Sequence, residues 1–183
     1  MTRIVSLAVA ALCASAAGVA VTAQTRGPAQ PVTDAMRASW DGAKKNIRDS
    51  ADVVPEALFG FSPVPGTVRT FGEIVGHVAG ANYVFCSAAK GEKSPHPEDA
   101  FEKLATKAAL VKAWDDSIAY CDGVFKSVTD RSAAEPIEMP FGMGKAVRTS
   151  ALLANIGHVN EHYGNLVTYM RLKGIVPPSS RGR

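Results

Sequence analysis

Residues 149–173 read TSALLANIGHVNEHYGNLVTYMRLK. The large apolar residues of this stretch recur every three or four positions, which is the period of an α-helix with one buried face. Gly174 suits the left-handed position after a helix, and Pro177-Pro178 prevents the helix from continuing. The stretch therefore predicts a helix from about Thr149 to Lys173. Its buried stripe consists of Leu152, Ile156, Val159, Tyr163, Leu166 and Met170.

Three further helices are predicted upstream by the same period. The first follows an N-cap at Thr33 and ends at Pro55, the second runs from Thr70 to about Ala89, and the third from about Thr106 to Val128. The long connections between them are rich in Pro and Gly, and only a short extended piece is expected, around 137–141. The sequence therefore predicts an all-α four-helix bundle with long connections over residues 33–178, followed by a C-terminal tail, 179–183.

The N-terminus has the organisation of a cleavable signal peptide. Arg3 supplies the positive charge, residues 4–20 are apolar, and Val21-Thr22-Ala23 is a small-residue cleavage site. We expect residues 1–23 to be the signal peptide and 24–32 a flexible leader. The protein is then exported, to the periplasm or the medium, and free of the membrane after cleavage. The alternative is an uncleaved anchor, for which the apolar run is short.

Two cysteines remain after the signal peptide, Cys86 and Cys121. Each lies late in its predicted helix. If those helices are antiparallel neighbours, the two cysteines lie at opposite ends of the bundle, too far apart for a disulfide. We therefore expect them to be unpaired.

The helix of residues 149–173 carries His158 and His162, which are spaced i and i+4 and so lie on one face. On a helical wheel they occupy the border between the apolar stripe and the polar side. His77 lies in the second predicted helix, which has no charged residue between Ile74 and Ala89. A buried imidazole there needs a partner. We expect His77, His158 and His162 to form a metal site.

Three neutral imidazoles suit Zn²⁺, and also Ni²⁺ or Fe²⁺, better than Mg²⁺ or Ca²⁺. Three protein ligands leave an open position for water or substrate, as in catalytic zinc sites. Glu161 lies between the two histidines and is the candidate catalytic residue, to hold or accept a proton from that water. The small net charge of +3, with dispersed Lys and Arg, argues against a nucleic-acid partner.

The remaining polar residues receive lesser roles. His158 to His162 also matches the inverted zinc-protease motif, but the 21 residues after His162 contain no Asp or Glu that could complete such a site. Glu73 is expected to cap the second helix. Asn165 is a candidate to support the metal ligands, and His96, between two prolines, is expected to be solvated.

The segments Thr70–Ala79 (TFGEIVGHVA) and His158–Asn165 (HVNEHYGN) resemble the second- and fourth-helix motifs of the DinB-like family, and LKGIVPPS at 172–179 is also typical of its members. The resemblance spans roughly residues 33–180. It implies a left-handed bundle, a divalent metal on His77, His158 and His162, and frequent homodimers. Some relatives are thiol-dependent transferases or isomerases, in which the metal activates the thiol of a small cofactor.

Three functions follow as hypotheses. The first is a small-molecule metalloenzyme that performs hydrolysis or nucleophilic addition, on a substrate that the sequence does not identify. The second is a thiol-dependent transferase, for which Arg148 or Lys145 would be the cationic group near the cofactor; the signal peptide argues against it, because small reduced thiols belong to the cytosol. The third is a non-enzymatic bundle that binds a metal or small ligand.

Overall fold

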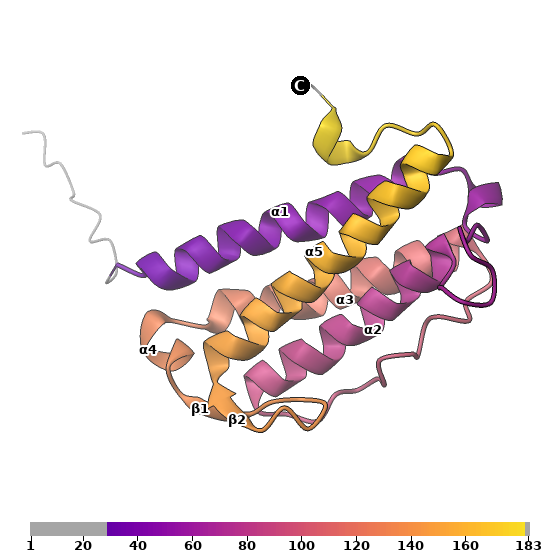
Figure 1. The fold of residues 1–183 in the computed structure, drawn as a ribbon. Helices are drawn as coiled ribbons and strands as arrows, with labels where there is room; N and C mark the ends of the chain where they lie inside the picture. Colours follow the sequence, from indigo (N-terminus) through magenta and orange to yellow (C-terminus); the bar gives the residue numbers. More distant parts are fainter. Residues whose placement is uncertain (1–28, 182–183) are drawn as a thin grey trace, which may run out of the picture.

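The computed structural model describes residues 29–181. The predicted signal peptide, and the predicted leader as far as residue 28, lie outside the described residues. Four long helices form the molecule: α1 (Pro31–Val53), α2 (Phe71–Lys90), α3 (Lys107–Ser127) and α5 (Arg148–Leu172), as Figure 1 shows. The predicted bundle is thus confirmed. None of the described helices is both long and apolar enough to cross a membrane.

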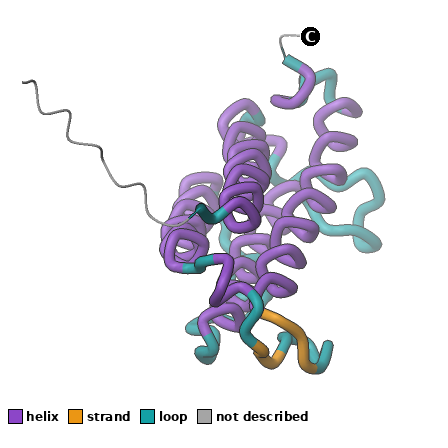
Figure 2. Tube along the Cα trace, turned by 90° about the vertical axis from the view of Figure 1, so that its left-hand side faces the viewer, coloured by secondary structure: helices purple, strands orange, loops and turns teal. Residues whose placement is uncertain are grey.

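Short elements occupy the connections. The 3₁₀ helix η1 (Glu56–Leu58) follows α1, the single-turn helix α4 (Asp130–Ala133) follows α3, and the 3₁₀ helix η2 (Pro178–Ser180) ends the described chain. Strands β1 (Pro136–Glu138) and β2 (Lys145–Val147) pair antiparallel. This two-stranded hairpin was not predicted, and it begins one residue before the expected extended piece. It lies outside the bundle, beside the start of α5 (Figure 2).

Local signals set most helix ends. Thr70 and Glu73 form a reciprocal capping box at the start of α2, as predicted, and Thr106 caps α3 by accepting a hydrogen bond from the Ala109 amide. The predicted cap of α1 is wrong. The cap position is Gln30, three residues before Thr33, and the helix begins at Pro31. Thr33 lies buried in the first turn, where its hydroxyl donates to Asp130. Proline at the first helical position removes an amide that would lack a partner in any case.

Helices α2 and α3 are parallel, not antiparallel. Residues further along α2 contact residues further along α3: Gly72 lies against Leu110, Asn82 donates to Ser117, and residue 86 contacts residue 121. The connection 91–106 makes this possible, because it runs back along α2 before α3 begins (Figure 1). Helices α1 and α5 run the opposite way, so the order is up, down, down, up.

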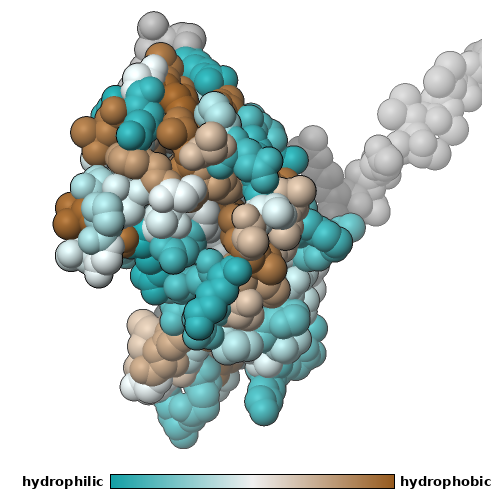
Figure 3. Space-filling view, turned by 90° about the vertical axis from the view of Figure 1, so that its right-hand side faces the viewer, coloured by the Kyte–Doolittle hydropathy of each residue, from teal (hydrophilic) through white to brown (hydrophobic). Residues whose placement is uncertain are grey.

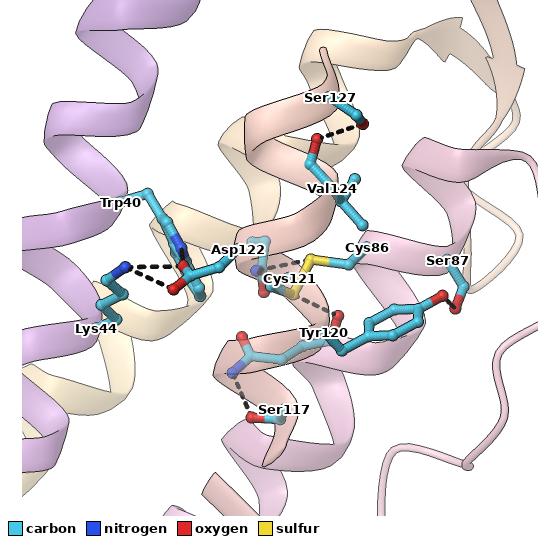
Figure 4. The surroundings of a disulfide bond; sticks show 12 residues. Trp40, Lys44, Cys86, Ser87, Ser117, Tyr120, Cys121, Asp122, Val124 and Ser127 are labelled. Atoms are coloured by element: carbon cyan, nitrogen blue, oxygen red, sulfur yellow. Dashed lines mark hydrogen bonds and ion pairs between the residues drawn. A yellow bond between two sulfur atoms is a disulfide. The ribbon is translucent and has the colours of Figure 1, made fainter. Parts of the chain in front are cut away.

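The parallel arrangement explains a wrong prediction. Cys86 and Cys121 are each about fifteen residues into their helices, so in parallel helices they lie at the same level, with Cα atoms 5.5 Å apart. They form a disulfide between α2 and α3 (Figure 4). The amide of Asn155 on α5 points at both sulfur atoms, at 3.7 and 3.8 Å. The disulfide therefore lies in the centre of the bundle.

The core fills the space between the four helices. Trp40 of α1 stacks on Phe125 of α3 with ring centroids 4.7 Å apart, and its indole nitrogen donates to Asp122 at 2.7 Å. The predicted stripe of α5 is buried throughout. Helix α2 is buried on nearly all sides, as the absence of charged residues between Ile74 and Ala89 predicts, because α3, α5 and the connection 91–106 all pack on it.

Candidate metal centre

The three histidines predicted as ligands meet between α2 and α5. The Nε2 atom of His158 lies 3.2 Å from Nε2 of His77 and 3.2 Å from Nε2 of His162. In the described part of the chain these residues form one group that could hold a metal ion, with ligand atoms all within 4.8 Å of one another. The site therefore combines two imidazoles from one helix turn with a third from the antiparallel neighbour.

Helix packing places these side chains. His77 is buried, with 6% of its surface exposed, whereas His158 and His162 are half-buried. This agrees with their predicted position on the border of the α5 stripe. Because α2 and α5 are antiparallel and in close contact, the first half of α2 faces the middle of α5. His77 thereby reaches the pair that is about eighty residues later in the chain.

Two hydrogen bonds turn the imidazoles toward a common centre. Nδ1 of His77 lies 2.9 Å from a carboxylate oxygen of Glu102, and Nδ1 of His162 lies 3.1 Å from the side-chain oxygen of Asn165. Both oxygens are acceptors, so each Nδ1 carries the proton and each Nε2 keeps its lone pair. Asn165 thus contacts a histidine of the cluster, while its predicted support of a metal ligand stays a prediction. For His158, Nδ1 is buried and has no hydrogen-bond partner among the described residues.

The surroundings keep two of the imidazoles neutral. Burial, followed by the nearby charges of His162, His77 and Arg69, lowers the pKa of His158 to about 3. Burial is also the main reason that the pKa of His162 is lowered. Neutral imidazole is the form that binds metal. Three imidazole Nε2 atoms that converge, with His158 Nε2 3.2 Å from each of the other two, form a donor set that fits a divalent transition metal.

A hollow of about 490 Å³ opens beside His162. Arg69 lines it and supplies a cationic group, and the Arg69 side chain also pairs with Glu102, with its Nε 3.2 Å and one terminal nitrogen 3.1 Å from the carboxylate oxygens. The face that carries the connections 54–70 and 91–106 is hydrophilic across its middle, with apolar residues beside this band (Figure 3). The remaining lining residues are Thr67, Val68, Ile74, Asn165 and Tyr169.

The other predicted residues lie apart from this centre. Glu161 is exposed, and its negative charge only partly offsets the burial that lowers the pKa of His162. Arg148 donates hydrogen bonds to the carbonyl of Ala89 and to Glu135. It precedes His158 by ten residues of α5, or about 15 Å along the helix. Lys145 is exposed on the hairpin. His96 is not simply solvated, because its ring packs on Tyr83 at 4.8 Å.

Sequence reasoning missed two residues that act on the site, Arg69 and Glu102. Both lie in irregular connections, where no helical period relates them to the histidines. Glu102 follows His77 by 25 residues and reaches it only because the connection 91–106 folds back on α2. No local motif signals such a contact.

The fold and the three-imidazole cluster together define a helical bundle with a candidate metal centre. A model of the DinB superfamily matches residues 23–166, and the chain belongs to this superfamily. The family predicted from the two histidine motifs is therefore confirmed. No curated protein matches the chain.

Solved structures share the fold at low sequence identity. A DinB-like protein from Bacillus cereus ATCC 10987 is 18% identical, with a TM-score of 0.67 over 79% of this chain and 95% of that one. A conserved protein from Enterococcus faecalis is 16% identical, with a TM-score of 0.62 over 77% and 96%. The mycothiol-dependent maleylpyruvate isomerase is 19% identical, with a TM-score of 0.61 over 73% of this chain and 60% of the isomerase.

Proposed function

We propose that this chain is an exported metal-binding protein of the DinB superfamily and acts as a small-molecule metalloenzyme. The ion is Zn²⁺, with Ni²⁺ or Fe²⁺ as alternatives, and its ligands are the Nε2 atoms of His77, His158 and His162. The observation that carries the proposal is the convergence of these three nitrogens, with His158 Nε2 3.2 Å from each of the others. The donor type suits these metals and suits Mg²⁺ or Ca²⁺ poorly.

The residues around the ion support a role in chemistry. A bound divalent metal lowers the pKa of a water molecule or polarises a substrate oxygen. Glu102 and Asn165 orient two of the ligands, and such outer contacts commonly tune affinity and reactivity. The hollow beside His162 offers room for a small molecule next to the cluster. Glu161 keeps its proposed role in proton transfer only if a substrate or water bridges its exposed carboxylate to the ion.

The test is metal analysis of histidine variants. We expect the purified protein to hold about one divalent ion per chain, and the variant His158→Ala/His162→Ala to lose it, because one imidazole alone is a weak site. His96→Ala is the matched control, since this fourth histidine contacts Tyr83 and Phe101 and not the cluster. Elemental analysis that finds full occupancy in the double variant would disprove the three-histidine site.

A thiol-dependent transferase or isomerase is the second candidate. The likeness in fold to mycothiol-dependent maleylpyruvate isomerase favours it, and Arg69 beside the cluster could pair with a cofactor carboxylate, the role predicted for Arg148 or Lys145. In this case a small thiol, added to the Co²⁺-loaded protein, would produce a sulfur-to-metal charge-transfer absorption. An unchanged spectrum at millimolar thiol would argue for the hydrolytic proposal.

Export is supported by the disulfide Cys86–Cys121, because disulfides persist in oxidising compartments and are rare in the cytosol. We expect the mature protein, recovered from the periplasm or medium, to begin at Gln24. N-terminal sequencing checks this, and material that still begins at Met1 would contradict cleavage. The homodimer stays a prediction.

A further inference from the structure

A carboxylate that the sequence did not single out faces the metal site. An oxygen of Glu98 lies 3.7 Å from Nε2 of His77, and this is the nitrogen that lies 3.2 Å from Nε2 of His158. His77 thus has a carboxylate at each ring nitrogen: Glu102 at Nδ1 and Glu98 at Nε2. Glu102 is already engaged with Nδ1 and with Arg69, whereas Glu98 lies on the side of the ring that faces the other two imidazoles.

Close backbone packing holds Glu98 in this place. The carbonyl oxygen of Glu98 lies so near α2 that a Cβ atom on Gly80 would be 1.9 Å from it, and one on Gly76 would be 2.4 Å from the Phe101 carbonyl. Gly76 and Gly80, one turn apart, therefore let the backbone of the connection 91–106 pack directly on α2 beside His77. This packing sets the distance between the Glu98 side chain and the cluster.

Glu98 is close enough to His77 for both to bind one ion after a movement of the Glu98 side chain. Two ligands of a four-coordinate zinc, each about 2.0–2.1 Å from the metal, are roughly 3.3–3.4 Å apart when the angle is tetrahedral. The two Nε2–Nε2 distances of 3.2 Å are close to this value, and the distance of 3.7 Å between His77 Nε2 and Glu98 Oε1 is somewhat longer. The group of ligand atoms within 4.8 Å of one another contains the three histidines without Glu98, so binding requires the Glu98 side chain to turn toward the ion. Charge also favours a carboxylate ligand, because imidazoles that bind as neutral ligands leave the two positive charges of the ion uncompensated in a half-buried site.

We propose that Glu98 is a fourth, carboxylate ligand of the ion held by the three histidines. The inference rests on the proposed metal site and sharpens it. With Glu98 bound, a tetrahedral zinc keeps no free position, so a substrate would bind by raising the coordination number to five or by displacing the carboxylate. A metal that takes six ligands would keep two positions.

The experiment compares Zn²⁺ affinity, by competition with a chromogenic chelator, between the wild-type chain and two carboxylate variants. Glu98→Gln is expected to bind Zn²⁺ at least 10-fold more weakly, since even outer contacts of a metal site are worth about 10–100-fold. Glu92→Gln is the matched control, because Glu92 is an exposed carboxylate of the same connection that pairs with Lys90, and its affinity is expected to stay within about threefold of wild type. The absorption bands of the Co²⁺-loaded protein are expected to change in Glu98→Gln and not in Glu92→Gln.

A second variant separates ligation from charge. Glu98→Asp keeps the negative charge but shortens the side chain by one methylene, so it is expected to weaken binding if Glu98 is a ligand and to leave it unchanged if charge alone matters. Affinities and Co²⁺ spectra of Glu98→Gln or Glu98→Asp equal to those of wild type would overturn the proposal and leave the three-histidine site intact. A wild-type chain that binds neither ion would overturn the metal site itself.

Discussion

At the scale of single residues, the start of α1 depends on Asp130 of α4. The Asp130 carboxylate accepts hydrogen bonds from the amides of Val32 and Thr33 and from the Thr33 hydroxyl. These are amides of the first turn, which have no partner within the helix, and α1 has no side-chain cap of its own. A residue about a hundred positions away therefore supplies the cap and the negative charge that the helix dipole favours there.

We predict that Asp130→Ala lowers the free energy of unfolding at neutral pH, and that the difference from wild type shrinks in acid. The backbone hydrogen bond from Thr33 is the main reason that the pKa of Asp130 lies below its ordinary value of 3.8. A lowered pKa in the folded state stabilises the protein at pH above 3.8, and this contribution is lost as the pH falls through the folded value. Urea unfolding at pH 7 and pH 3 measures it.

The control is Asp49→Ala, which removes an aspartate of α1 that pairs with Lys45 one turn away. Such exposed pairs contribute little. A difference between wild type and Asp130→Ala that is equally large at both pH values would show that the carboxylate charge is not responsible.

At the scale of secondary structure, the connection 91–106 does more than join two helices. It packs on Gly76 and Gly80 and places Glu98 and Glu102 next to the two ring nitrogens of His77. It also runs back along α2, so that α3 begins at the same level as α2. A helical pattern identifies the ends of this segment but not its path. At Gly80 the group that approaches α2 is the backbone of Glu98.

We predict that Gly80→Ala destabilises the protein by about 1–3 kcal/mol, because the new methyl group forces the connection away from α2. Metal affinity should fall as well, since Glu98 moves with the connection. Gly123→Ala is the matched control, since a Cβ there meets nothing within 4 Å, and replacing a helical glycine gains up to about 1 kcal/mol. Chemical unfolding and Zn²⁺ competition measure the two effects. A Gly80→Ala protein as stable as Gly123→Ala would mean that the backbone of the connection does not pack closely on Gly80.

At the scale of the whole molecule, the disulfide ties the two parallel helices together across the centre of the bundle. The bond joins Cys86 and Cys121, which are 35 residues apart in the chain, so it closes a loop that contains the whole connection 91–106. Closing such a loop restricts the unfolded chain and leaves the folded one unchanged.

We predict that reduction, or the variant Cys86→Ala/Cys121→Ala, lowers the free energy of unfolding by about 2–4 kcal/mol. The measurement is urea unfolding with and without a reductant, with the double variant as the control that the reductant should not affect. Identical midpoints for oxidised and reduced wild-type protein would contradict a stabilising bond.

The helices, the bundle and the three candidate ligands follow from local features of the sequence. Helical period and capping signals are local, so they locate α2, α3 and α5 to within one or two residues. The absence of charged residues between Ile74 and Ala89 predicts that α2 is buried. The i, i+4 spacing of His158 and His162 places both on one face of their helix. His77 could be joined to them because it is a titratable group on a buried helix.

Tertiary structure alone decided the relative direction of the helices and everything that depends on it. A period of 3.6 residues states which face of a helix is buried but not whether its neighbour runs parallel or antiparallel. The antiparallel assumption separated Cys86 from Cys121, while the path of the connection 91–106 brings them within 5.5 Å. The same path brings Glu98 and Glu102 to His77, because contacts between an irregular segment and a helix follow no sequence period.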